Sequence, residues 1–248
     1  NEIESQGAKR IATALSCLTS LSLLDLRSND FGPTGSQHIS RGLAACTTLT
    51  YLALGDNIVG PRGMAHFNEI LERTPLLEYI GANDNELNAD AIATMCISFR
   101  SLFPPLVHLA LANNLIKDTG CHHLSATLPW LPTLQILDLR LNCISHTGAR
   151  ALAEMLSKMK SLKELDLAFN EIGPFGASAL CRSVVDSNSS LRLLDISGNS
   201  IGRSGRAEIL SARAVCPLVE VSGQDEVPDD QLPSNISSDS EDPNVSSD

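Results

Sequence analysis

Residues 134–142 read Leu-Gln-Ile-Leu-Asp-Leu-Arg-Leu-Asn, and this stretch decides the fold because its pattern recurs along the chain. The pattern is L-x-x-L-x-L-x-x-N, and its copies follow one another at intervals of 28 or 29 residues. They start at Leu21, Leu49, Leu77, Leu106, Leu134, Leu162 and Leu191, and we number them units 1 to 7. A fixed period of this length predicts a solenoid, in which each repeat buries its apolar face only by stacking on its neighbours.

The first half of each unit predicts a short strand and a turn. In unit 1, Leu24 and Leu26 alternate with Asp25 and Arg27, which is typical of a strand with one buried face. The ninth residue of every unit is Asn: Asn29, Asn57, Asn85, Asn114, Asn142, Asn170 and Asn199. We expect the Asn amide to pair with backbone groups of the tight turn, and the arrangement to repeat from unit to unit as a ladder.

The second half of each unit predicts a helix. Gly-Pro pairs such as Gly60-Pro61 place Pro where a helix begins, since its missing N–H has no intrahelical partner there. In unit 5, Gly148, Leu152 and Leu156 lie on one helix face, and the other units repeat this stripe. Gly or Ala at the first stripe position suggests that the helix backbone packs close against the strand layer.

These repeats together predict an α/β fold, a curved horseshoe solenoid with a parallel β-sheet on the concave face and α-helices on the convex face. The curvature is expected because a helix is wider than the spacing between strands. The extended pattern L-x-x-L-x-L-x-x-N-x-I/L-x-x-x-G-x-x-x-L resembles the ribonuclease-inhibitor type of leucine-rich repeat, and the resemblance covers Asn1 to about Val221.

The composition divides the chain into a repeat array at residues 1–222 and an acidic tail at residues 223–248. The array holds a partial repeat at 1–20, seven full repeats from residue 21 and a terminal half-strand near 218–221. The tail contains Ser and Pro and no Lys or Arg, so we expect it to be disordered. Because the partial repeat lacks a strand, we expect further repeats before residue 1, or a partner strand on the open sheet edge.

The charge and cysteine content exclude several classes of function. Lys and Arg number 18 against 29 Asp and Glu, which argues against nucleic-acid binding. No apolar run approaches the ~20 residues that span a bilayer, so we expect no membrane span. Seven Cys, an odd number without a C-x-x-C pair, predict reduced thiols and a cytoplasmic protein, with a nuclear or cytoskeletal site as the alternatives.

The sequence contains no sign of catalytic machinery or of a cofactor. No phosphate-binding loop, H-E-x-x-H or G-x-S-x-G motif is present, so we expect no enzyme and no catalytic residues. His122 and His123 adjoin Cys121, but consecutive residues of a helix diverge by ~100°, and we expect no metal site. Asp138, Asp166 and Asp195 share one outward strand position. Their carboxylates could raise one another's pKa or hold a cation, but we favour an ordinary feature of the repeat, paired with Arg140.

Candidate partner-binding residues come from reading the strands as columns across the sheet. Tyr51, Tyr79 and His108 fall in one column beside Ala53, Gly81 and Ala110, and small neighbours should leave the rings accessible. Rigid tyrosines are common anchors of protein interfaces because they offer much contact area at low entropic cost.

Charged and apolar residues complete the candidate site. Charged residues flank the rings: Asp56 and Asp84 at the loop edge, and Asp138 and Arg140 beyond them. Leu141 and Phe169, at matching positions of successive units, form a second candidate patch.

The function predicted from these features is a non-enzymatic scaffold that binds a protein partner on the concave sheet face. The resemblance implies two alternatives, because the same repeat occurs in activators of the Ran GTPase and in the sensing arms of nucleotide-binding immune receptors. The partner's identity does not follow from the residues.

Overall fold

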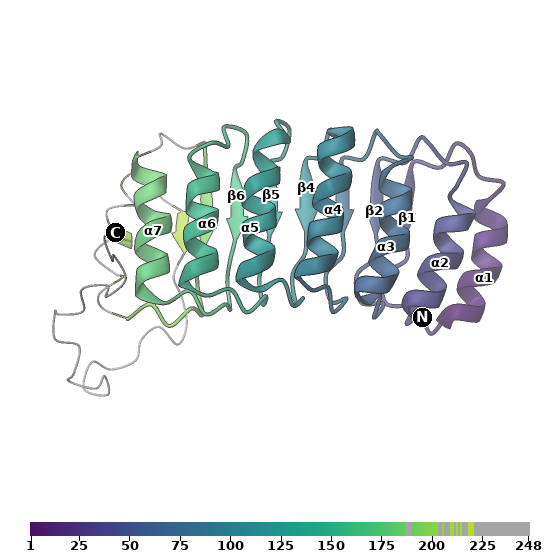
Figure 1. Ribbon diagram of the computed structural model, residues 1–248, viewed down its shortest axis with the longest axis horizontal. Helices are drawn as coiled ribbons and strands as arrows, with labels where there is room; N and C mark the ends of the chain where they lie inside the picture. Colours follow the sequence, from purple (N-terminus) through teal and green to yellow (C-terminus); the bar gives the residue numbers. More distant parts are fainter. Residues whose placement is uncertain are drawn as a thin grey trace, which may run out of the picture.

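The computed structural model describes residues 1–186, 190–202 and 218–220, and residues 205, 209, 210, 212 and 214 singly. Strands and helices alternate along the chain (Figure 1). The strands are β1 (Leu23–Asp25), β2 (Tyr51–Ala53), β3 (Tyr79–Gly81), β4 (His108–Ala110), β5 (Ile136–Asp138), β6 (Glu164–Asp166), β7 (Leu193–Asp195) and β8 (Leu218–Glu220). The helices are α1 (Glu4–Leu15), α2 (Gly32–Gly42), α3 (Gly60–Leu71), α4 (Ala89–Leu102), α5 (Lys117–Thr127), α6 (His146–Leu156) and α7 (Gly173–Asp186), with a 3-10 helix η1 (Leu128–Trp130) after α5. The tail predicted at 223–248 lies outside the described residues.

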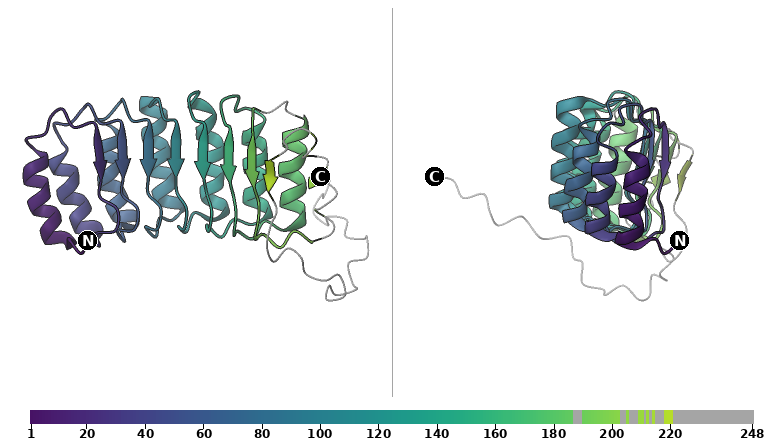
Figure 2. Two further views of the ribbon diagram at one scale, coloured as in Figure 1. Left: turned by 180° about the vertical axis from the view of Figure 1, so that it is seen from behind. Right: turned by 90° about the vertical axis from the view of Figure 1, so that its right-hand side faces the viewer.

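The elements form two layers. The strands pair in parallel in chain order from β1 to β8, and the helices cover one side of this sheet while the other side stays open (Figure 2). In unit 5, Leu137 and Leu139 are fully buried between the layers. The helix residues Leu152 and Leu156 are buried there too, with at most 1% of their surface exposed. The predicted α/β solenoid, with a parallel sheet on one face and helices on the other, is confirmed.

The repeated geometry of the turns comes from the Asn residues, which are buried and pair as expected. Asn142 donates its Nδ2 protons to the carbonyls of Leu139 in its own unit and Leu111 in the unit before, at 3.1 and 2.9 Å. Its backbone N–H donates to Oδ1 of Asn170 at 2.8 Å. Each amide therefore satisfies turn carbonyls that burial would otherwise leave unpaired, and it joins consecutive units.

The glycines of the helix stripe adjoin the neighbouring helix, which differs from the expected packing against the strand layer. A Cβ on Gly176 would lie 3.0 Å from Cα of His146 in the preceding helix, and one on Gly148 would lie 3.2 Å from Cα of Asp118. Cγ2 of Ile172 and of Ile144, in the same units, would lie 2.6 and 2.8 Å from these Cβ atoms, so the unit's own Ile and the neighbouring helix together exclude a side chain.

The helix starts differ along the chain, as α3 and α6 show. Gly60 opens α3 with φ +59°, a left-handed conformation that suits Gly, and Pro61 follows. In contrast, α6 begins after Ser145, whose Oγ accepts from the N–H of Thr147. Asp118 of the preceding unit adds a second cap, because its Oδ1 accepts from the N–H groups of Ser145 and Gly148 at 2.8 and 3.0 Å. The strand-to-helix turn of unit 5 thus ties α6 to the unit before it.

The first strand has no described strand on its outer side. Leu23 of β1 is 56% exposed, and Oδ1 of the buried Asn29 has no hydrogen-bond partner among the described residues. The pairing of this edge with a further repeat or a partner strand stays a prediction.

Candidate functional site

The aromatic residues predicted to line the sheet face lie side by side on β2, β3 and β4. Tyr51 pairs in register with Tyr79, and Tyr79 with His108. The two tyrosine rings stack with centroids 4.2 Å apart and planes 7° from parallel, and the His108 ring meets Tyr79 edge-on at 4.9 Å. The three rings form a continuous strip, which we call the aromatic strip.

The small residues beside the strip have a different effect from the one expected. Ala53 and Ala110 are buried, at 0% and 3% exposure, and a Cβ on Gly81 would come within 2.7 Å of the Tyr79 hydroxyl. The Tyr79 ring therefore lies across Gly81, and Tyr51, Tyr79 and His108 are each only partly exposed. A partner can reach their upper surfaces but cannot enclose them.

Burial also sets the protonation of the strip. Desolvation raises the pKa of Tyr79, and the neighbouring Tyr51 adds to the shift. Desolvation lowers the pKa of His108, and this effect outweighs the opposing influence of Asp138 and Glu164. Both shifts favour the uncharged forms of Tyr79 and His108.

Asp138 and Arg140, predicted to pair, form a planar ion pair on the sheet face. Arg140 donates from Nε and Nη2 to the two carboxylate oxygens of Asp138, at 3.0 and 2.8 Å. Its Nε also lies 3.1 Å from Oδ2 of Asp166 on the next strand. One guanidinium thus serves two carboxylates on adjacent strands.

The carboxylate ladder that follows is only partly compensated. Asp138, Asp166 and Asp195 are in register on β5, β6 and β7. Desolvation raises the pKa of Asp166 to about 6, with Asp138 and Asp195 adding to the shift against the effects of Arg140 and of the Ala168 N–H. The sequence offers two interpretations of this ladder: carboxylates that raise one another's pKa, or an ordinary feature of the repeat paired with Arg140. The two operate together.

The loop edge, where strands turn toward helices, holds several left-handed residues, among them Ile58 with φ +52° and 51% exposure. One of these positions, directly before the recurring Asn, is left-handed in every unit. The φ angles are between +50° and +68° at Ser28, Asp56, Asp84, Asn113, Leu141, Phe169 and Gly198. Asp, Asn and Gly tolerate this conformation, whereas large apolar side chains rarely adopt it. Leu141 and Phe169 are nevertheless 48% and 60% exposed there, and the Phe169 ring lies over Gly198. The sequence shows that Leu141 and Phe169 occupy equivalent positions of two units, but it does not show their backbone conformation.

Asp56 and Asp84 do not join the aromatic strip. They are exposed and line an open groove of about 440 Å³ along the loop edge, together with Ile58, Glu86 and Leu115. The Nδ2 group of Asn113 donates to Oδ1 of Asp84. The carboxylates that affect the pKa of His108 are instead Asp138 of β5 and Glu164 of β6, which lie on the strands themselves.

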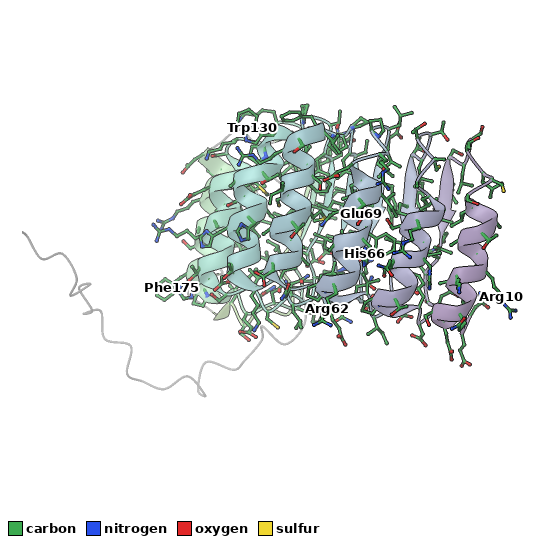
Figure 3. The ribbon with its side chains drawn as sticks, turned by 45° about the vertical axis from the view of Figure 1, so that its right-hand side comes forward. Arg10, Arg62, His66, Glu69, Trp130 and Phe175 are labelled. Carbon is green, nitrogen blue, oxygen red and sulfur yellow. The ribbon has the colours of Figure 1, made fainter. Side chains whose placement is uncertain are left out.

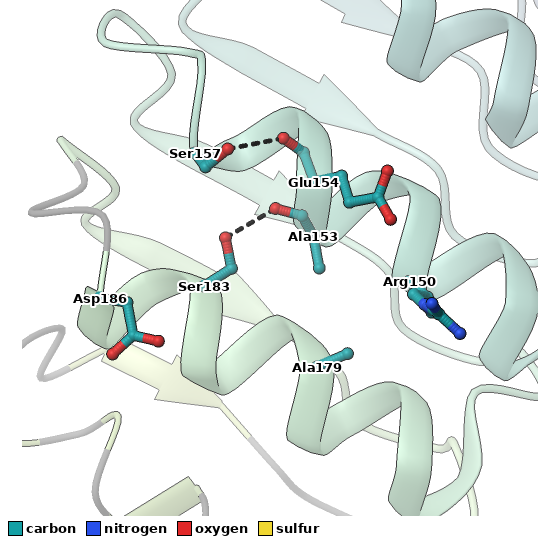
Figure 4. A pocket seen from close by; sticks show the side chains of 7 residues that line it. All are labelled: Arg150, Ala153, Glu154, Ser157, Ala179, Ser183 and Asp186. Carbon is teal, nitrogen blue, oxygen red and sulfur yellow. Dashed lines mark hydrogen bonds between the residues drawn. The ribbon is translucent and has the colours of Figure 1, made fainter.

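The helix side carries features that sequence reasoning missed. A groove of about 420 Å³ runs between α6 and α7, with Ala153 and Ala179 among its lining and Arg150, Glu154 and Asp186 at its sides (Figure 4). Two hydrogen bonds lie within its lining, from Ser183 Oγ to the Ala153 carbonyl and from Ser157 Oγ to the Glu154 carbonyl. An outward-facing set on α3 includes Arg62 and the His66–Glu69 pair, while Trp130 and Phe175 lie near opposite ends of the helices (Figure 3). The spacing of residues along one helix does not reveal this groove, because its two walls belong to different helices.

Metal and thiol chemistry have little support in the geometry. Within the described residues, no three His, Cys, Asp or Glu side chains come together as a metal site. Burial raises the pKa of the Cys121 thiol, so it is protonated. The described cysteines are free thiols, and no described helix has the length and apolarity needed to cross a membrane.

The repeat sequence itself matches a known family. A family model described as Leucine Rich repeat matches residues 17–39, 45–66, 131–153, 158–181 and 187–210. These five segments are leucine-rich repeats. No curated protein sequence matches it.

Several solved leucine-rich repeat structures resemble the fold. A chain of the octameric complex of Latrophilin 3, Unc5D and FLRT2 (LRR) is 16% identical over 78% of this chain and 59% of that chain, with a TM-score of 0.46. An internalin from Listeria monocytogenes is 17% identical over 85% and 70%, with a TM-score of 0.44. The ectodomain of the receptor kinase GASSHO1/SCHENGEN3 from Arabidopsis thaliana is 15% identical over 77% and 25%, with a TM-score of 0.39. The leucine-rich repeats described here span only part of each of these chains.

Proposed function

We propose that this leucine-rich repeat protein is a non-enzymatic scaffold of the ribonuclease-inhibitor type that works in the cytoplasm. Its protein partner docks on the sheet face of units 5 and 6 and on the loop edge beside it. The general use of leucine-rich repeats as protein-interaction scaffolds supports the class of function. The location on the molecule rests on one observation, the conformation and exposure of Leu141 and Phe169.

Leu141 and Phe169 lower the stability of the isolated protein in two ways. A left-handed conformation costs a residue with a branched or aromatic side chain about 1 kcal/mol or more. Both side chains also remain about half exposed or more, so little apolar surface is removed from water in return. The equivalent positions of other units hold Ser, Asp, Asn or Gly, and most of these suit the conformation. Retaining two apolar residues in adjacent units is explained if a partner covers them.

The aromatic strip has a supporting role in this proposal. Its rings are stacked on one another and one of them lies across a glycine, so their positions are fixed before any partner arrives. Preordered aromatic surface adds contact area without a further loss of side-chain entropy. Tyr51, Tyr79 and His108 therefore extend the contact surface, while Leu141 and Phe169 anchor the partner.

Quantitative affinity capture tests the proposal. The full chain and its L141N/F169N variant would be used as baits in the same cell extract, with bound proteins measured by mass spectrometry. Capture of the partner should fall at least tenfold with L141N/F169N. The matched control is L76N/I97N, which replaces two exposed apolar residues on the helix side and its edge, 49% and 65% exposed. Equal loss of the same captured protein with both variants, or with the control alone, would place the interface elsewhere.

A further inference from the structure

We propose that the partner presents a basic, extended segment, whose Lys or Arg side chains meet the carboxylates of β6 and β7 while an adjoining apolar side chain contacts Leu141 and Phe169. This inference rests on the proposed docking face and adds the chemistry of the partner. It is carried by the arrangement of charge on the open side of the sheet.

The outward positions of β5, β6 and β7 carry an excess of negative charge. They hold Asp138, Glu164, Asp166 and Asp195. Arg140, two residues after Asp138, is the cation that contacts them among the described residues. A surface with four carboxylates and one guanidinium is electrostatically complementary to a cationic partner.

The positive charge of Arg140 is already paired within the chain. Both oxygens of Asp138 accept from Arg140, and the guanidinium extends from there only to Asp166. Glu164 and Asp195 make no ion pair within the described part of the chain, although Oδ1 of Asp195 accepts from the Ser197 N–H. These two side chains retain free oxygen atoms for donors supplied from outside.

Lys163 does not supply a second positive charge to these carboxylates. Lys163 immediately precedes Glu164, and consecutive residues of a strand point to opposite sides. Its Nζ donates to Oε1 of Gln135 in the preceding unit. The lysine is thereby held beside the start of β5, and the carboxylates on the open face are left to an outside cation.

The spacing suits a polypeptide. Parallel strands lie about 4.8 Å apart, so Asp166 and Asp195, which pair in register, offer two carboxylates at that interval to a chain crossing the strands. Leu141 and Phe169 follow Asp138 and Asp166 by three residues, or about 10 Å along an extended backbone. A segment with basic residues and one apolar residue within a few positions can therefore contact both features at once, which a small polyamine cannot.

The test uses a random peptide library displayed on phage and selected on the immobilised full chain. Selected peptides would be synthesised with a fluorescent label, and their dissociation constants measured by fluorescence anisotropy at low and high NaCl. We expect the peptides to be enriched in Lys and Arg next to an apolar residue. Their affinity should fall at least tenfold with E164Q/D166N/D195N, and it should weaken with salt.

The variants keep the fold and separate the two proposals. Each amide preserves the acceptor oxygen of its carboxylate, so the Ala168 and Ser197 N–H groups stay satisfied. The matched control, E72Q/E154Q/D186N, removes three charges on the helix side and should bind the peptides as the wild type does. Circular dichroism and urea unfolding would verify that each variant is folded.

Two outcomes would overturn the inference while leaving the docking face in place. One is a set of peptides without basic enrichment that still loses affinity with L141N/F169N. The other is a set of basic peptides that the triple amide variant binds as tightly as the wild type. Peptides that bind L141N/F169N unchanged, or a selection that enriches none, would overturn the proposed docking face and the basic partner together.

Discussion

At the scale of the residue, the loop edge separates what stabilises the fold from what is available for binding. The position directly before the recurring Asn is left-handed in every unit, and most units fill it with Ser, Asp, Asn or Gly. Leu141 and Phe169 have the same backbone conformation without the side chains that favour it. The sequence aligns these two residues correctly, but a repeat pattern carries no dihedral angle, so their strain could be recognised only in the structure.

Replacing these residues with Asn should therefore stabilise the protein. We expect L141N and F169N each to raise the free energy of unfolding by about 0.5–1 kcal/mol, because Asn adopts the left-handed conformation more readily. Urea denaturation followed by circular dichroism measures the change. A loss of more than about 1 kcal/mol in either variant would mean that the side chain stabilises the folded state through contacts that outweigh its strain.

Asp166 makes a second prediction at this scale, through pH. Its folded-state pKa of about 6 lies above the ordinary value of 3.8, so the folded protein binds this proton more tightly than the unfolded chain does. The resulting stabilisation is complete below about pH 4 and is lost as the pH rises through about 6. Because the amide introduced by D166N cannot titrate, the variant should gain stability relative to the wild type by about 1–2 kcal/mol between about pH 4 and pH 7.

Urea unfolding of both proteins across this pH range measures the difference between them. Taking the difference removes the contributions of other titrating groups, which the two proteins share. A difference that stays constant from about pH 4 to pH 7 would contradict a raised pKa at Asp166.

At the scale of the element, each unit depends on groups supplied by the next. Asn142 shows this most clearly, because its amide serves carbonyls of two units and its backbone N–H bonds to the amide of a third. The sequence predicts this ladder because Asn recurs at a fixed position. It does not predict that Asp118 caps α6 of the following unit, because a single carboxylate at one unit boundary leaves no repeated pattern.

The ladder predicts unequal effects of equivalent substitutions. N142A should lower the free energy of unfolding by about 3 kcal/mol or more, since it leaves buried turn groups without partners. N29A should cost about 1–2 kcal/mol, because the Asn29 Oδ1 atom has no partner among the described residues and its Nδ2 serves only carbonyls of its own unit. Urea unfolding of both variants measures the contrast. Equal losses would show that the amides act independently of the stacked neighbours.

At the scale of the whole molecule, the repeat pattern predicts the layers, the order of the strands and the alignment of columns across the sheet. Those features depend on the repeat period, and a single sequence shows that period because the repeat recurs several times along the chain. Two features of the site depend instead on side-chain packing: the Tyr79 ring lies across Gly81, and Arg140 joins two strands. Asp56 and Asp84 lie at the loop edge, where the sequence places them, and the groove that they line there depends on side-chain packing as well.

Photo-crosslinking from the loop edge tests the central claim, that the partner docks at units 5 and 6, most directly. A photoreactive phenylalanine analogue would replace Phe169 in one protein and Ile97 in another, since both side chains are exposed and Ile97 lies on α4 on the opposite layer. Both proteins would be irradiated with the captured partner under the same conditions. The account predicts a covalent adduct from position 169 and none from position 97, and an adduct from position 97 without one from position 169 would contradict it.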